Sequence, residues 1–425
     1  MRGIMEKRKH IIIGSGSAGL SALKQIRKIG SMDEVKLITM EDYLPYSPAS
    51  LPYLLSDRIT EADIPIVSDG FFDEMDAILV KGRKVEGIDT SGKKVIYAND
   101  QSESYDTLLI ATGSEPVISP LLKQAGISGF HTIDDYVRIK QLKNKSKITV
   151  LGAGLVGMEL AIALVEKGHE VSVVAPRERV LRNYFDTEIG NYIINLFAEK
   201  GVLINLNWGE VTKVKKEGDI TKVTFTSGRN LETAVLITCT GVQPRLSCLD
   251  GSKININRGI LVDNRMRSNI PDVFAAGDVA EAPDFLTGRN GLSLILPSSV
   301  EQGKIAGINM AGGTAIYQGW LPMNIFNFFG HLAVSVGKSE PSEGEQVLVK
   351  KDPERRRYSK LIYNNDCLTG ATFLDIDVNG GVLQYLIKKR INMASYKEAL
   401  IEEPKEVSLW LMLEMERKES LSLEG

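Results

Sequence analysis

The sequence predicts an α/β protein made of two Rossmann-like units, followed by a small α+β domain near the C-terminus. The prediction rests on a Gly-x-Gly-x-x-Gly pattern that occurs twice, at residues 14–19 and 152–157, each time between an apolar strand and a helix. In such a turn the first glycine permits a tight bend and the second lets the backbone approach a pyrophosphate, while the third lets the helix pack against the strand. One copy alone is weak evidence, but two copies in this setting predict two dinucleotide-binding units.

A second repeated element supports the duplication. Residues 105–116 and 231–244 each form an apolar strand that ends in Thr-Gly, with a proline close behind. Each follows one glycine turn at a similar distance, 113 − 14 = 99 and 241 − 152 = 89 residues. We therefore expect the two units to share one internal order of elements.

Acidic residues follow the second strand of the first unit, at residues 35–42. A carboxylate that binds ribose is expected about 20 residues after the glycines, and Glu41, at 41 − 14 = 27, is our candidate. The plainer interpretation is a pair of solvated acids at a strand end.

The second unit lacks this acid. Its strand at residues 171–174 is followed by Ala175, and then by three arginines, Arg177, Arg179 and Arg182. A missing acid with arginines nearby favours a 2′-phosphate, hence NADP, but only weakly because surface arginines are common. The choice between NAD and NADP stays open.

A third feature is the strand at residues 270–276, which ends in Gly277-Asp278. A carboxylate there can accept hydrogen bonds from the hydroxyls of a polyol. Ser298-x-x-Glu301 has the spacing of a capping box and predicts the start of a helix there. A helix N-terminus aimed at a flavin ring would stabilise negative charge on it, although an ordinary capped helix explains the same residues.

The segment from about residue 319 to the C-terminus is expected to be a separate domain. Residues 358–363 and 367–374 are predicted to form a hairpin around Asn-Asn-Asp. Helices are expected at residues 381–389 and at about 404–418. Trp410, Leu411 and Leu413 on the last helix are most simply interpreted as core.

Composition excludes several classes of protein. The 51 Lys and Arg against 54 Asp and Glu leave a formal charge of −3, so no charge excess indicates a nucleic acid or an anionic membrane as partner. Three cysteines without a Cys-x-x-Cys pair and four histidines support neither a disulfide framework, nor an iron–sulfur cluster, nor a zinc site. No apolar stretch approaches the length of a membrane span. We expect a cytoplasmic protein.

Together these motifs resemble the flavoproteins with two dinucleotide-binding domains, the pyridine nucleotide-disulfide oxidoreductase superfamily, over about residues 8–315. The resemblance implies an FAD domain at residues 1–115 and 245–318, an inserted NAD(P)H domain at 116–244 and a dimerisation domain at 319–425. It implies the following FAD contacts: Gly14, Gly16, Ser17, Gly19, Glu41, Thr112, Gly113, Gly277 and Asp278. It implies these NAD(P)H contacts: Gly152, Gly154, Val156, Glu159 and Gly241.

The segment at residues 44–55 resembles the NADH oxidase and coenzyme A-disulfide reductase branch, in which a redox cysteine precedes a similar Ala-Leu-Pro-Tyr. Here that position is Ala49, and no cysteine precedes Cys239. This departure makes disulfide reduction improbable. The tail also resembles, less specifically, the flavin subunit of phenylglyoxylate dehydrogenase-type complexes.

The resemblance implies an FAD-dependent NAD(P)H oxidoreductase that passes electrons through its flavin, without a redox thiol, to a protein or small-molecule acceptor. The cofactors supply the chemistry, and no side chain acts as a nucleophile. The favoured hypothesis is a reductase for a redox protein or for iron–sulfur subunits, as a homodimer or as part of a hetero-oligomer. The alternatives are a stand-alone, peroxide-forming NAD(P)H oxidase and a flavin- and NAD(P)-binding sensor or assembly factor.

Overall fold

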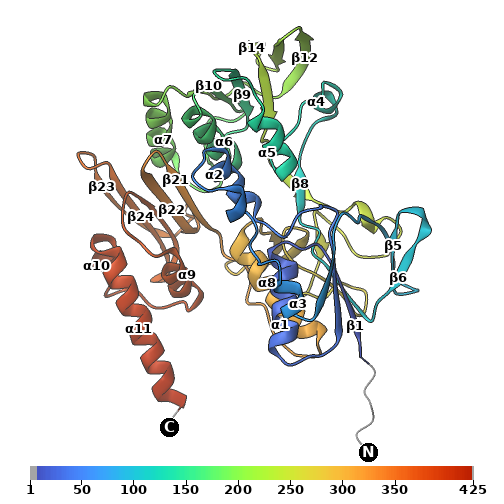
Figure 1. Cartoon of the computed structure of the whole chain (residues 1–425). Helices are drawn as coiled ribbons and strands as arrows, with labels where there is room; N and C mark the ends of the chain where they lie inside the picture. The colour runs from blue at the N-terminus through green and yellow to red at the C-terminus, as the bar shows by residue number, and fades with distance from the viewer. Residues whose placement is uncertain (1–6, 424–425) are drawn as a thin grey trace, which may run out of the picture. The chain divides into compact units, whose positions relative to one another are not determined.

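The computed structural model describes residues 7–423, which form two compact units (Figure 1). The first unit comprises the described part of Met1–Val117, together with His131–Ile133 and Val242–Trp320. The second comprises Ile118–Phe130, Asp134–Gly241 and the described part of Leu321–Gly425. Each unit therefore contains one of the two glycine turns.

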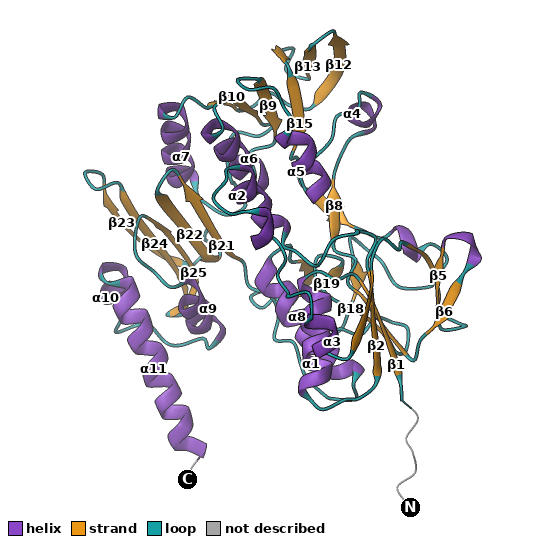
Figure 2. Cartoon of the chain, in the orientation of Figure 1, coloured by secondary structure: helices purple, strands orange, loops and turns teal. Residues whose placement is uncertain are grey.

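The first unit is built on a parallel five-stranded sheet with the order β18-β7-β1-β2-β3 (Figure 2). Its strands are β1 (Lys9–Ile13), β2 (Glu34–Ile38), β3 (Ala77–Val80), β7 (Thr107–Ile110) and β18 (Val273–Ala275). The central strands are apolar and almost wholly buried, as expected for a parallel sheet that is covered on both faces. The register pairs Ile11 with Leu108, and Leu108 with Val273, so residues far apart in the sequence lie side by side.

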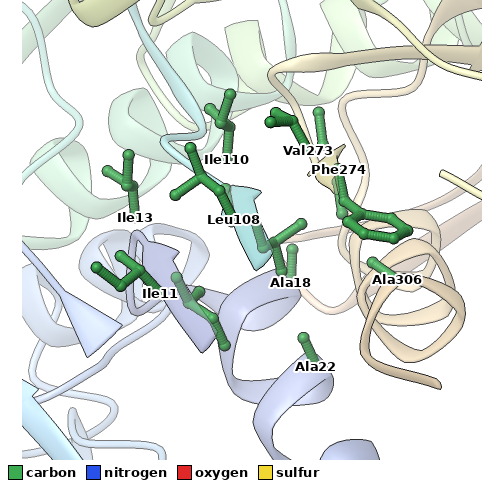
Figure 3. Close-up of a cluster of buried hydrophobic side chains, with 14 of the residues drawn as sticks. Ile11, Ile13, Ala18, Ala22, Leu108, Ile110, Val273, Phe274 and Ala306 are labelled. Carbon is green, nitrogen blue, oxygen red and sulfur yellow. The ribbon is translucent and has the colours of Figure 1, made fainter. Parts of the chain in front are cut away.

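Two helices pack on each other unusually closely in this unit. They are α1 (Ser17–Lys28) and α8 (Leu296–Met310). A Cβ atom on Gly303 would lie 2.2 Å from the carbonyl oxygen of Ala18, so the backbones approach because this position has no side chain. Figure 3 shows the small side chains of Ala18, Ala22 and Ala306 beside the apolar residues of the sheet.

Shorter elements complete the first unit. The helices and 3₁₀ turns are η1 (Pro48–Ser50), α2 (Leu51–Leu55), η2 (Glu61–Asp63), α3 (Phe71–Glu74), η3 (Ala98–Asp100) and η4 (Ser247–Leu249). The strands form three small sheets: β4 (Val85–Asp89), β5 (Lys94–Tyr97) and β6 (Ser102–Ser104); β8 (Ser114–Pro116) and β16 (Val242–Pro244); β17 (Ile260–Leu261), β19 (Ala280–Pro283) and β20 (Asn290–Leu292).

The second unit repeats the strand–turn–helix arrangement. Its parallel sheet has the order β11-β10-β9-β15, from β9 (Lys147–Leu151), β10 (Glu170–Val174), β11 (Leu203–Asn205) and β15 (Val235–Thr238). An antiparallel sheet contains β12 (Val211–Glu217), β13 (Ile220–Phe225) and β14 (Asn230–Thr233). The helices are α4 (Pro120–Gln124), α5 (Ile133–Lys140), α6 (Leu155–Glu166) and α7 (Thr187–Glu199).

The C-terminal part of the second unit is an antiparallel sheet with the order β21-β22-β25-β24-β23, with three helices. The strands are β21 (Met323–Phe328), β22 (His331–Gly337), β23 (Gln346–Asp352), β24 (Arg357–Asn364) and β25 (Cys367–Leu374), and the helices are α9 (Gly380–Lys388), α10 (Lys397–Glu402) and α11 (Pro404–Leu423). The hairpin predicted around Asn-Asn-Asp is confirmed as β24–β25. The α/β fold class with two Rossmann-like units and a C-terminal sheet domain is likewise confirmed.

A buried ionic cluster joins this sheet to α7. Asp186 caps the helix by accepting from the backbone N–H of Ile189 at 3.1 Å. The same carboxylate accepts from the Tyr358 hydroxyl at 2.6 Å and pairs with the Lys360 ammonium at 2.6 Å. Because both charges are buried, each is compensated by the other.

Two expectations from the sequence are wrong. Ser298 does not cap a helix, because α8 already begins at Leu296, so Ser298 lies inside the first turn and accepts from the Ser293 hydroxyl at 2.8 Å. Of the residues expected in the core of the last helix, only Leu411 is buried; Trp410 is 48% exposed and Leu413 is 53% exposed.

The close helix packing generates a stability prediction. Gly303→Ala forces a methyl group against the backbone of α1 and should lower the free energy of unfolding by about 2–3 kcal/mol. The matched control is Gly190→Ala in α7, where the nearest atom to an added Cβ lies at 3.8 Å. The control should be neutral or stabilising by up to about 1 kcal/mol. Urea denaturation of both variants measures the difference, and equal effects would contradict the packing argument.

Candidate cofactor site

One cavity of about 360 Å³ lies in the first unit, at the carboxyl ends of its parallel strands. Gly14 follows β1, Glu41 follows β2, Thr112 follows β7 and Asp278 follows β18, so one edge of the sheet brings all four segments together. Eight of the nine residues predicted to contact FAD line this cavity: Gly14, Gly16, Ser17, Glu41, Thr112, Gly113, Gly277 and Asp278. Gly19 does not line the cavity, because it packs against the turn.

The three glycines of the turn differ in their surroundings. A Cβ on Gly14 would lie 2.0 Å from the carbonyl oxygen of Ala111, and one on Gly19 would lie 2.1 Å from the carbonyl oxygen of Gly14. A Cβ on Gly16 would meet no atom within 4 Å. The first and third glycines therefore serve packing, whereas the backbone of the second is open to a ligand.

The second unit has nearly the same geometry. A Cβ on Gly152 would lie 2.2 Å from the carbonyl oxygen of Cys239, and one on Gly157 would lie 2.1 Å from the carbonyl oxygen of Gly152. Gly154 again has no atom within 4 Å of an added Cβ. Both turns therefore leave an open backbone at the N-terminus of the following helix, where partial positive charge attracts an anion.

Asp278 is a half-buried acid that lines the cavity. It accepts from the Ser114 hydroxyl at 2.7 Å and from the Ser299 hydroxyl at 3.4 Å. Burial raises the pKa of Asp278 above its ordinary value, and the Ser114 hydroxyl acts in the opposite direction. A carboxylate has about four acceptor positions, so this one retains capacity for ligand hydroxyls.

Sequence reasoning missed the side chain that holds this acid's turn in place. The amide oxygen of Gln302, which is wholly buried on α8, accepts from the backbone N–H of Gly277 at 2.8 Å. Sequence reasoning likewise missed the contact of Tyr46, whose hydroxyl donates to Glu41 at 2.6 Å. Gln302 lies 25 residues from Gly277, so no local pattern indicated it. Tyr46 lies only five residues from Glu41, in the segment at residues 44–55, and a search for hydroxyl groups close to the candidate acid could have found it.

The predicted NAD(P)H contacts lie around the second turn. Gly152, Gly154, Val156 and Glu159 lie on the turn and on α6, and Gly241 follows β15, which pairs with β9. Val156 is 41% exposed. Glu159 is largely buried, and its desolvation raises its pKa to about 7, so this carboxyl group changes charge within the physiological range.

The three arginines after β10 differ in their surroundings. Arg179 pairs with Glu340 at 2.9 Å and approaches the Thr187 hydroxyl at 3.4 Å. Its guanidinium is therefore engaged inside the second unit. Arg177 and Arg182 are exposed.

Two of the three cysteines, Cys239 and Cys248, are poor candidates for redox chemistry. Cys248 lines the cavity of the first unit, a position that sequence reasoning missed, and burial raises its pKa to about 11. Burial raises the pKa of Cys239 to about 12. Both groups are thiols near neutral pH, and the thiolate is the reactive form. Ala49 lines the same cavity as Cys248.

The described part of the chain lacks both a metal-binding group of side chains and a membrane-spanning helix. Within residues 7–423, His, Cys, Asp and Glu do not gather in a group that could hold a metal ion. The same residues contain no helix that is long and apolar enough to span a membrane.

The chain belongs to the pyridine nucleotide-disulphide oxidoreductase family, whose model matches residues 8–312. It is 33% identical to the NADH-dependent phenylglyoxylate dehydrogenase subunit epsilon of Aromatoleum evansii, covering 96% of this chain and 98% of that protein. It is 28% identical to the assimilatory nitrate reductase electron transfer subunit of Bacillus subtilis, over 94% of this chain but only 51% of that longer protein.

Among solved structures, the chain has the fold of the water-forming NADH oxidase from Lactobacillus brevis bound to NADH. The TM-score is 0.84 at 23% identity, and the match covers 98% of this chain and 100% of the oxidase. The family resemblance drawn from the motifs is thereby confirmed, and the cofactors of this family are FAD and NAD(P)H.

The raised pKa of Glu159 generates a pH prediction. Its folded pKa of about 7 exceeds the ordinary value of 4.5, so its contribution to stability is full below pH 4.5 and is lost as the pH rises through 7. Glu159→Gln removes this loss. The free energy of unfolding of the variant, relative to that of the wild type, should therefore increase by roughly 2–3 kcal/mol when the pH is raised from 5 to 8. Urea denaturation at both pH values measures it.

The control is Glu166→Gln, at the exposed C-terminal end of the same helix. The difference in free energy of unfolding between this variant and the wild type should be the same at the two pH values. A pH-independent effect of Glu159→Gln would contradict the shifted pKa.

Proposed function

We propose that this protein is an FAD-dependent NAD(P)H:acceptor oxidoreductase that passes electrons to a protein acceptor without a redox thiol of its own. The observation that carries the proposal is the composition of the first unit's cavity. Its lining combines the glycine turn, Glu41, the Thr-Gly turn and Asp278 with Ala49, at the position where the NADH oxidase and coenzyme A-disulfide reductase branch carries a redox cysteine.

The residues of the first unit fit FAD. The open backbone at Gly16 and the N-terminus of α1 suit a pyrophosphate, and Glu41 suits a ribose diol. Asp278, half-buried and held by Ser114, suits the hydroxyls of a ribityl chain. We assign Ser17, Thr112, Gly113 and Gly277 to the same site because they line the same cavity.

We assign the second turn to NAD(P)H. The open backbone at Gly154 and the N-terminus of α6 suit its pyrophosphate. Glu159, one turn further along α6, can accept a hydrogen bond from the nicotinamide amide when ionised. Because its pKa is about 7, we expect this hydrogen bond to weaken as the pH falls below neutrality.

Bound FAD would supply the chemistry of hydride transfer from NAD(P)H and of electron transfer to an acceptor. The chain's own residues bind and orient the cofactors, and the N-terminus of α8, whose residues 295, 296 and 299 line the cavity, places positive potential beside the site. Neither Cys248 nor Cys239 offers a thiolate near neutral pH, so we infer that electrons leave without a disulfide relay.

A protein acceptor is supported by the names of two relatives. One is a subunit of an NADH-dependent dehydrogenase and the other is an electron transfer subunit, and both match this chain over at least 94% of its length. We infer that this chain is a reductase that passes electrons to a separate redox protein or to iron–sulfur subunits of a complex to which it belongs.

Anaerobic mixing of the purified protein with NADH and with NADPH tests the proposal. We expect fast bleaching of bound flavin, fast transfer to an artificial dye and slow reoxidation by oxygen. Fast oxygen consumption would instead favour a peroxide-forming oxidase. If neither nucleotide reduces the bound flavin, the protein is instead a flavin- and NAD(P)-binding sensor or assembly factor.

A cysteine-free variant tests the thiol-free mechanism. The chain has three cysteines, so Cys239→Ala, Cys248→Ser and Cys367→Ser remove every thiol. We expect the rate of dye reduction by NADH to stay within about threefold of the wild-type rate. If a redox thiol were essential, its removal would lower this rate by several orders of magnitude. The flavin content of each preparation is the control for folding. Loss of dye reduction with full flavin content would refute the mechanism.

A further inference from the structure

The two neighbouring acids that follow β2 have different surroundings. The side chain of Asp42 is 84% exposed, and its carboxylate lies 3.9 Å from the ammonium group of Lys81. Glu41 is half-buried, and among the described residues the lining of the cavity includes Glu41 but not Asp42. Two acids that merely meet solvent at a strand end would have similar surroundings. The difference indicates that the Glu41 carboxylate is held for a purpose.

The backbone of Glu41 is fixed at both of its polar groups. Its N–H donates to the Thr39 hydroxyl at 3.3 Å, and its carbonyl oxygen accepts from the N–H of Gly82 at 3.1 Å. A glutamate side chain still has freedom about its own bonds, and ordering it costs conformational entropy. The fixed backbone therefore does not by itself place the carboxylate.

Tyr46 holds the carboxylate of Glu41. Its hydroxyl donates to Glu41 Oε2 at 2.6 Å, a length typical of a hydrogen bond to an ionised acceptor. The hydroxyl oxygen also accepts from the backbone N–H of Ile133 at 3.3 Å, so its proton is directed to Glu41. All three residues belong to the first unit. Within residues 7–423, Tyr46 is the one group that hydrogen-bonds to this carboxylate, so Oε1 keeps its acceptor positions.

The loop that carries Tyr46 is itself anchored. Tyr46 forms an isolated antiparallel β-bridge with Pro65, and the carbonyl oxygen of Pro45 accepts from the N–H of Ile66 at 2.9 Å. The tyrosine is half-buried and lines the same cavity as Glu41. A tyrosine side chain has two rotatable bonds, so an anchored backbone places its hydroxyl at a low entropy cost.

We propose that Tyr46 is a positioning residue for the adenosine ribose of FAD. It holds Glu41 through Oε2 and leaves Oε1 to accept hydrogen bonds from the vicinal hydroxyls of the ribose. This inference rests on the proposed function, which assigns Glu41 to that ribose. Because the carboxylate is ordered before the ligand arrives, binding does not include the cost of ordering it. Tyr46 therefore contributes to the affinity for FAD only while Glu41 is present.

A double-mutant cycle on the full chain tests this dependence. The flavin is removed from the wild type, Glu41→Ala, Tyr46→Phe and the double variant, and the Kd for FAD is measured from the change in flavin fluorescence. We expect Tyr46→Phe to raise the Kd about three- to tenfold, and Glu41→Ala to raise it about tenfold or more. The double variant should have the Kd of Glu41→Ala, because Tyr46 then has no carboxylate to position.

Two matched controls and a second ligand separate positioning from a general loss of structure. Tyr53→Phe and Asp42→Ala remove a hydroxyl and a carboxylate that do not line the cavity, and should leave the Kd for FAD unchanged. FMN lacks the adenosine, so Tyr46→Phe should change the Kd for FMN less than twofold. A loss of affinity that is equal for FAD and FMN would show a structural role instead, and would overturn the inference.

The remaining outcomes distinguish this inference from the proposed function. A wild-type chain that binds no FAD would overturn both. If the wild type binds FAD and Tyr46→Phe or Glu41→Ala binds it equally well, only the inference is overturned. Losses that add in the double variant would also overturn it, since they would mean that Tyr46 contacts FAD independently of Glu41.

Discussion

Close backbone contact at the two glycine turns is the constraint on which the rest of the structure depends. Gly14 lies against the carbonyl of Ala111, and Gly152 lies against that of Cys239. Each turn therefore needs the Thr-Gly strand of its own unit as the immediate neighbour of the strand that precedes it. This requirement fixes β7 beside β1 and β15 beside β9. A repeat that looks local in the sequence thereby determines pairing between strands about 90 residues apart.

The same constraint explains why much of the fold and site was predictable. Parallel strands end at one edge of a sheet, so the motifs that follow β1, β2, β7 and β18 had to converge. Eight of nine candidates line one cavity for this reason. Gly19 is the exception because its lack of a side chain lets the helix pack against the carbonyl group of Gly14, and it does not line the cavity.

Features that depend on a single long-range side-chain contact were not predictable. Gln302 holds Gly277 from a helix that begins 19 residues later, and Cys248 reaches the cavity from a 3₁₀ turn with no motif of its own. Trp410 and Leu413 illustrate a different failure. Helical periodicity shows which residues share a face, but only the tertiary structure shows whether that face is covered.

Burial raises the pKa of both thiols and carboxyl groups in this protein, but the consequences for the two kinds of group differ. It raises the pKa of Cys248 to about 11 and that of Cys239 to about 12, which removes both sulfur atoms from nucleophilic chemistry near neutral pH. The same physical effect raises the pKa of Glu159 only to about 7, because a carboxyl group starts from a much lower value. Desolvation thus keeps these two thiols protonated near neutral pH, whereas it leaves the Glu159 carboxyl group able to change charge there. Under the proposed function, the chain contributes binding and orientation, and the bound cofactors supply the electron transfer.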